Sequence, residues 1–154
     1  MDKTQKRKRA NHQKEWYDEI ISQTRRFATL LSGTNEYTEE NKLYHYALRE
    51  IVRNVFEHSL ADECYLCGQR WADGRVEVAV IDEGVGISAS LKRSFEIESE
   101  IDALRKAIKP GVSSTTKIAE ADNIYDNSGF GLYVLEQLVS SFGWFMLGSG
   151  SAKI

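Results

Sequence analysis

The order of periodic segments along this sequence predicts an α/β fold, a sandwich in which a sheet carries helices on one face. Two stretches with apolar residues at every third or fourth position come first, which is the pattern of amphipathic helices. Two alternating stretches around a turn follow, as in a β-hairpin. Two more helical stretches and a short strand complete the expected order.

The first helix is expected from Trp16 to about Leu31, where Gly33 and the residues after it end the pattern. The second starts after Thr38, a residue type that caps helix N-termini, and runs to about Ser59. Its apolar stripe consists of Tyr44, Ala47, Leu48, Ile51, Val52 and Val55.

The expected hairpin consists of residues 63–71, a turn at 72–74 and a return strand over 75–81. Val76, Val78 and Val80 share one face of the return strand. The same period of two places the carboxylate of Asp82 on that apolar face, which is unusual for a charged side chain.

The second half of the chain is less regular. Residues 88–127 are polar and mixed, with a helix expected from about Phe95 to Ile108 and a loop over 113–127. A last helix is expected from about Phe130 to Phe142, followed by a strand over 144–147.

Composition indicates a soluble globular protein, with 42% hydrophobic and 28% charged residues. No apolar run approaches the ~20 residues that cross a bilayer, and no secretory signal is visible. Two cysteines without such a signal favour a reducing, cytoplasmic location. We therefore expect no contact with a membrane.

Charge is uneven along the chain. Residues 1–15 contain six Lys or Arg residues together with Asp2 and Glu15, so their net charge is +4. Because the whole chain has a net charge of −3, the remaining residues carry a net charge of −7. We expect a solvated basic arm over 1–15 and one domain over 16–154. The balance as a whole gives no reason to expect binding to nucleic acid.

Three polar residues of the second helix, Glu50, Asn54 and His58, are spaced by four. In an α-helix each lies 40° around the axis from the one before, so they form a stripe beside the apolar face. Such groups are costly to bury unless they are paired. They are either structural polar residues or part of a site.

Two glycine-containing segments offer sites for a ligand. In Asp82-Glu83-Gly84-Val85-Gly86, the inward carboxylate can accept a hydrogen bond from an amino group such as that of adenine, and the glycines let a ligand approach the backbone. In the segment from Asn127 to Leu132, glycines open a helix whose N-terminal amides favour an anion. Each pattern alone also fits an ordinary turn or helix entry.

Together and in this order, LREIVRNVFEHS, VAVIDEGVGI and NSGFGLYVLEQLV resemble the GHKL superfamily of ATP-binding domains. The resemblance covers about residues 40–150. It implies the Bergerat fold, an α/β sandwich with a mixed, mostly antiparallel sheet that binds ATP and Mg²⁺ under a mobile lid. The lid would fall within residues 88–127, with Lys109 and Lys117 as the nearest cations.

The resemblance implies a role for each matching residue. Glu50 would be the general base, Asn54 the Mg²⁺ ligand, and Asp82 the residue that binds adenine. The glycines would approach the nucleotide and its phosphates, and His58 would be structural or supporting. The implied nucleotide-binding residues are Asn54, Asp82, Gly84, Gly86, Ser128, Gly129, Phe130, Gly131 and Leu132.

Differences from the sequence pattern of the superfamily indicate which type of GHKL protein this chain resembles. Glu57 stands where histidine kinases often have a basic residue, and neither His12 nor His45 has the context of a phosphoacceptor. The last strands of the family sheet and a catalytic lysine from a further domain are missing. Glu50 with Asn54 and His58 looks most like the anti-sigma-factor type of serine kinase, whose partners are STAS-type proteins. The chain could also form a homodimer.

Three functions remain open from sequence: an ATPase or protein-serine kinase, a non-catalytic ATP-sensing module that regulates a protein partner, and an interaction domain without nucleotide. The Cys64-Tyr65-Leu66-Cys67 segment has CxxC spacing but no second ligand pair, so zinc or redox chemistry is less expected than two buried small side chains.

Overall fold

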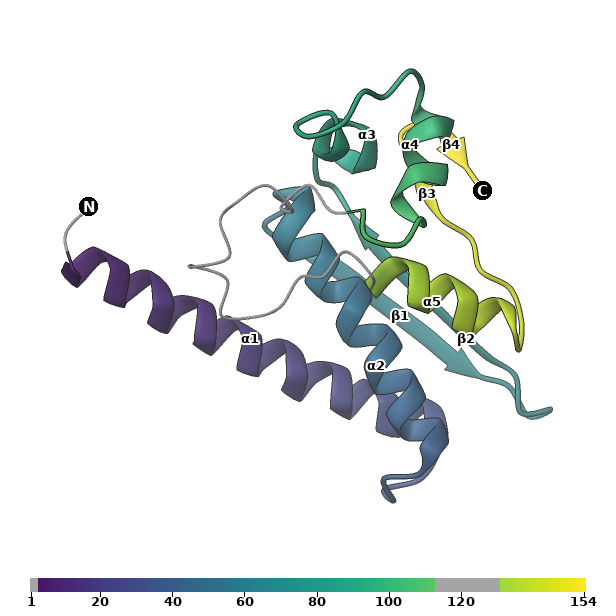
Figure 1. The fold of residues 1–154 in the computed structure, drawn as a ribbon. Helices are drawn as coiled ribbons and strands as arrows, with labels where there is room; N and C mark the ends of the chain where they lie inside the picture. The colour runs from purple at the N-terminus through teal and green to yellow at the C-terminus, as the bar shows by residue number, and fades with distance from the viewer. Residues whose placement is uncertain (1–2, 113–130) are drawn as a thin grey trace. The chain divides into compact units, whose positions relative to one another are not determined.

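The computed structural model describes the backbone of residues 3–112 and 131–154, with side chains from Glu15 onwards (Figure 1). The prediction of a mixed α/β composition is confirmed. The described elements are α1 (Lys3–Ser32), α2 (Glu39–Asn54), a π-helix η1 (Val55–Ser59), β1 (Cys64–Arg70), β2 (Val76–Asp82), α3 (Gly86–Leu91), α4 (Glu100–Ala107), α5 (Gly131–Ser140), β3 (Gly148–Ser149) and β4 (Ala152–Lys153).

The chain forms two compact units. The first contains Met1–Arg53 and Leu66–Ala79, and the second contains Asn54–Tyr65 and Val80–Ile154. β1 and β2 form one two-stranded sheet, and β3 and β4 form another. The tip of the β1–β2 hairpin belongs to the first unit and its open end to the second.

The core of the first unit lies where α1, α2 and the hairpin tip pack together. Ala28, Leu31 and Leu48 are buried there, and Leu66 and Val76 pack against them. Burial of these side chains follows from the helical and alternating periods of the sequence.

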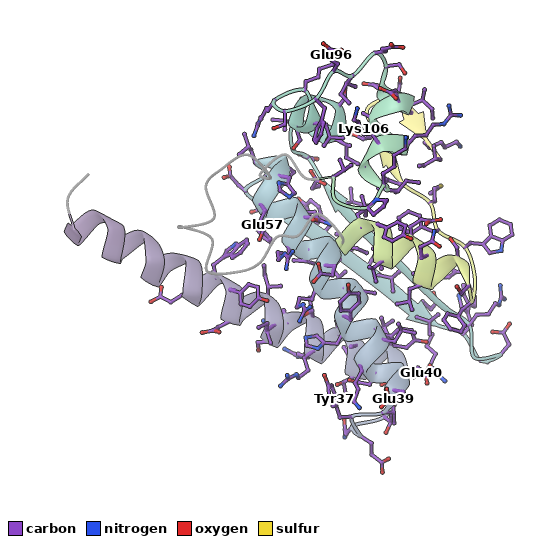
Figure 2. All side chains as sticks on the ribbon, in the orientation of Figure 1. Tyr37, Glu39, Glu40, Glu57, Glu96 and Lys106 are labelled. Carbon is purple, nitrogen blue, oxygen red and sulfur yellow. The ribbon has the colours of Figure 1, made fainter. Side chains whose placement is uncertain are left out.

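Polar contacts fix the register of the same helices. Asn41 Nδ2 donates to Thr29 Oγ1 at 3.3 Å and to Ser32 Oγ at 3.2 Å. Arg70 Nη1 donates to the Leu31 carbonyl at the end of α1 and to Glu40 Oε1, both at 3.0 Å. Figure 2 labels Glu40 at the beginning of α2.

In the second unit, the β3–β4 turn is tied to α3 and α4. Ser149 Oγ accepts the Ile87 N–H at 2.9 Å. Glu100 Oε2 accepts the Ser151 N–H at 2.8 Å and the Ser151 hydroxyl at 2.7 Å. The Ser151 hydroxyl and then its amide lower the pKa of the Glu100 carboxyl.

Several predicted boundaries differ from the structure. α1 begins at Lys3 rather than Trp16, so most of the predicted basic arm is helical. α3 was not expected, because six residues are too few for a periodic signal. α4 begins at Glu100 rather than near Phe95, because Ser99 is extended and its side chain caps the helix by accepting the Asp102 N–H.

The strand predicted over 144–147 is wrong. These residues lie outside any strand, and β3 begins after them, with Gly148 opposite Lys153 and Ser149 opposite Ala152 in an antiparallel register. Leu147, the last of them, is paired through backbone hydrogen bonds of 3.0 Å and 2.9 Å exchanged with Ile154. The turn uses Gly150 at φ +61°. The continuous apolar run over 144–147 misled the prediction, because Trp144 and Met146 are 97% and 77% exposed and so lack the packing that would favour a strand. The predicted loop over 113–127 lies outside the described residues.

Candidate functional site

Glu50 lies in the first unit on α2 and is only 4% exposed. Its Oε1 accepts Nε and Nη2 of Arg49 at 3.3 Å and 3.0 Å. Its Oε2 lies 3.5 Å from Nη2 of Arg53. A buried carboxylate needs such partners, so the predicted base is an ion-paired side chain in this structure.

Asn54, the last residue of α2, is half-buried in the second unit. Its backbone is helical, at φ −60° and ψ −38°, and its side chain makes no capping hydrogen bond. Among the described residues, none forms a hydrogen bond with this amide. Its oxygen is therefore free of protein donors from the described parts of the chain, as a ligand for Mg²⁺ would need to be.

The predicted helical stripe does not continue to His58. The α-helix ends at Asn54, and Val55–Ser59 form a π-helix, whose wider ring turns fewer degrees per residue. The 40° spacing from Asn54 to His58 is therefore wrong. His58 Nε2 lies 4.0 Å from Oε2 of Glu57, which is labelled in Figure 2, and both side chains have further partners. Leu60 ends the π-helix in a left-handed conformation at φ 58°.

Asp82 is the last residue of β2 and is half-buried, as the alternation predicted. Val76 and Val80 on the same face are also half-buried, whereas Val78 is 39% exposed. Asp82 Oδ1 accepts the Gly84 N–H at 2.9 Å. Within the described parts of the chain, no donor lies on Oδ2, so this oxygen can accept a further hydrogen bond.

Cys64 lies across from Asp82 in the hairpin. The bond from the Trp71 N–H to the Arg75 carbonyl sets a register in which the first residue of β1 faces the last residue of β2. Burial, and then the Asp82 carboxylate, raise the pKa of the Cys64 thiol. Cys67 is exposed, so the prediction that both cysteines are buried is wrong for this residue.

Gly84 and Gly86 make close contacts within the second unit. A Cβ at Gly84 would lie 2.3 Å from the Ser59 carbonyl oxygen, and a Cβ at Gly86 would lie 2.8 Å from Ser149 Oγ. The Val85 N–H donates to the Ser59 carbonyl at 2.7 Å. The loop after Asp82 thus rests on the end of the π-helix that follows Asn54, and packing alone explains both glycines.

The third predicted segment is only partly described. Gly131 and Leu132 begin α5 and are half-buried. Ser128, Gly129 and Phe130 lie outside the described residues, as does Lys117. Asn54, Asp82 and the two loop glycines thus belong to the second unit, where the loop after Asp82 contacts the π-helix that follows Asn54, and Glu50 belongs to the first unit.

The two arginines that pair with Glu50 were not predicted from the sequence. Arg49 precedes Glu50, and Arg53 follows it by three positions, a spacing at which helical side chains meet. That spacing was the available signal. In the described ranges 3–112 and 131–154, no group of three His, Cys, Asp or Glu side chains forms a metal cluster. A hollow in the first unit is lined by residues between Asp18 and Asn35 and includes none of the predicted site residues.

Comparison with models of protein families, with curated proteins and with solved structures finds no match to this chain. None of the helices in the described parts of the chain has the length and apolar character needed to cross a membrane.

Proposed function

We propose that this chain is a Mg-ATP-binding domain of GHKL type with a Bergerat sandwich. It would hydrolyse ATP or transfer the γ-phosphate to a serine of a protein, as anti-sigma-type kinases do. The observation that carries the proposal is a pair of polar groups in the second unit. The Asn54 amide and Asp82 Oδ2 accept no hydrogen bond from the described residues, and the Ser59–Val85 bond joins their two segments.

Asp82 would bind the base. Gly84 holds Oδ1, which orients the carboxylate and leaves Oδ2 for the exocyclic amine of adenine. A carboxylate accepts hydrogen bonds and donates none, so it favours adenine over a base with a carbonyl at that position.

Asn54 would hold the metal. An amide oxygen suits a hard cation that keeps several waters and is otherwise bound through phosphates, so the residues present fit Mg²⁺. When bound, Mg²⁺ would neutralise charge on the phosphates. Gly131 and Leu132 at the start of α5 would contribute to phosphate binding through backbone amides.

Glu50 would take a proton from the attacking water or serine hydroxyl. The attacking oxygen then forms a bond to the γ-phosphorus, the bond between that phosphorus and the bridging oxygen breaks, and ADP leaves with the electron pair. Glu50 subsequently returns the proton to solvent. A partner with a serine substrate, STAS-like or otherwise, follows from the kinase form of the proposal.

A second candidate is a non-catalytic ATP-sensing module that regulates a protein partner. The ion pairing of both Glu50 oxygens favours it, because an occupied carboxylate is a poor base. The two candidates share ATP binding and differ in turnover.

Isothermal titration with ATP, with and without Mg²⁺, tests the shared part, and a phosphate-release assay separates the candidates. Binding that Mg²⁺ strengthens in the native protein but not in Asn54→Ala supports the proposal. Glu50→Ala should bind ATP like the native protein and lose about 10²-fold or more in turnover, the scale of a general base. Absence of ATP binding would refute both candidates and leave an interaction domain.

A further inference from the structure

We propose that the two arginines on Glu50 have different tasks: Arg53 positions the carboxylate, and Arg49 is a restraint that must be released before Glu50 can act as a base. The inference rests on the proposed function, because it concerns how the base of that reaction becomes active. It follows from the contacts and burial of three side chains in the first unit.

The two arginines occupy different oxygens. Arg49 donates twice to Oε1, from Nε at 3.3 Å and from Nη2 at 3.0 Å. Nη2 of Arg53 lies 3.5 Å from Oε2, and Arg53 has a further partner besides Glu50. A general base needs a lone pair directed at the proton that it removes, and the paired donors of Arg49 cover Oε1. Release of Arg49 would therefore expose one oxygen, while the other oxygen stays held.

Burial decides which arginine can leave. The side chain of Arg53 is 9% exposed, whereas that of Arg49 is 29% exposed and lies over the Tyr46 ring at 5.5 Å. Moving a buried guanidinium away from its partner costs more than moving one that is partly exposed, because water can solvate the exposed part. Of the two arginines, Arg49 is therefore the one that can move away at the lower cost, because Arg53 still pairs with the buried carboxylate.

Each oxygen of the Glu50 carboxylate then has its own role in the reaction. Oε1, uncovered by Arg49, takes the proton of the attacking hydroxyl. Arg53 keeps Oε2 and thereby the orientation of the carboxylate. Because the guanidinium of Arg49 stays charged, it also balances the carboxylate between turnovers and keeps Glu50 inactive when no substrate displaces it.

The test compares turnover in Arg49→Met, Arg53→Met and Arg53→Lys with that of the native protein, and Arg105→Met serves as the matched control on an exposed helix position. We expect Arg49→Met to raise kcat by about two- to fivefold, because Oε1 is then free of its paired donors. We expect Arg53→Met to lower kcat by about 10²-fold, the effect of a misplaced catalytic group. KM for ATP should change by less than about twofold in all four variants, since neither arginine is assigned to nucleotide binding.

Opposite signs for the two arginines are the outcome that a merely structural role would not produce. Arg53→Lys should recover part of the lost kcat, because it restores a charge at Oε2, and it keeps the test valid if Arg53→Met fails to fold. A fall in kcat for both Arg49→Met and Arg53→Met, with Glu50→Gln inactive, would overturn this inference and leave the proposed function intact. A native protein that binds ATP without turnover, or with turnover that Glu50→Gln retains, would overturn the proposed catalysis and this inference together.

Discussion

Replacing Gly84 by alanine should destabilise the second unit, because there is no room for a side chain between the loop and the π-helix. The added Cβ would lie 2.3 Å from the Ser59 carbonyl oxygen and 2.5 Å from the Ser59 Cβ, both far inside contact distance. Gly84 is not among the residues with positive φ, so the effect would be steric rather than a matter of backbone conformation.

The expected loss follows from three contributions. Overpacking costs about 1–3 kcal/mol. Displacing the loop also weakens the 2.7 Å bond from the Val85 N–H to Ser59, a contribution of about 1 kcal/mol. Reduced freedom of the unfolded chain returns about 0.4–1 kcal/mol. The net destabilisation is about 2 kcal/mol.

Urea unfolding followed by circular dichroism measures this loss, and hydrogen exchange at the Val85 amide locates it. Gly143→Ala is the control, since its added Cβ would meet only the Val139 carbonyl oxygen at 4.0 Å. Equal midpoints for Gly84→Ala, Gly143→Ala and the native protein, with unchanged protection of Val85, would refute the reasoning.

Asp82→Asn should weaken ATP binding at least tenfold, or by about 1.4 kcal/mol, because the new amide can direct a donor at the amine of adenine. Calorimetry measures this loss, and unchanged affinity in a folded variant would contradict the assignment of Asp82. Leu60→Gly should raise the free energy of unfolding by up to about 1 kcal/mol, because glycine adopts the φ of 58° without a clash and Leu60, at 63% exposed, has little packing to lose. A loss of stability in urea would contradict this. Glu100→Gln should be less stable than the native protein at neutral pH. Because the pKa of Glu100 is lowered from its ordinary value of 4.5, this difference is present above that value and disappears as pH falls through the folded-state pKa. A difference that persists at pH 2 would argue against the bond to Ser151.

The periodicity of the sequence predicted which side chains of a single strand or helix are buried. The alternation of Val76, Val80 and Asp82 placed the carboxylate on the inward face, and the helical spacing around Leu48 predicted the buried side of α2. Such periods are properties of one strand or one helix. They can be recognised without knowing which element packs against the strand or helix, so the structure agrees with these predictions.

Other features depend on contacts that periodicity does not encode. The π-helix after Asn54 ends at Ser59, whose carbonyl accepts a hydrogen bond from Val85, 26 positions later in the sequence. Glu50 pairs with Arg49 and Arg53 because the polar side of α2 that carries Glu50 is buried too, and not only the apolar stripe. The short strands β3 and β4 depend on a turn at Gly150, and two-residue strands leave no periodic signal.

The division of the β1–β2 hairpin between the two units has a consequence for register. Leu66 and Val76 belong to the core of the first unit, and Cys64 and Asp82 belong to the second, but all four depend on one alignment of the two strands. A slip of one residue would turn Leu66 or Val76 out of that core and move Asp82 to the opposite face. Selection for a well-packed core in one unit therefore also keeps the carboxylate in place in the other, and neither unit can be excised as a continuous stretch of the chain.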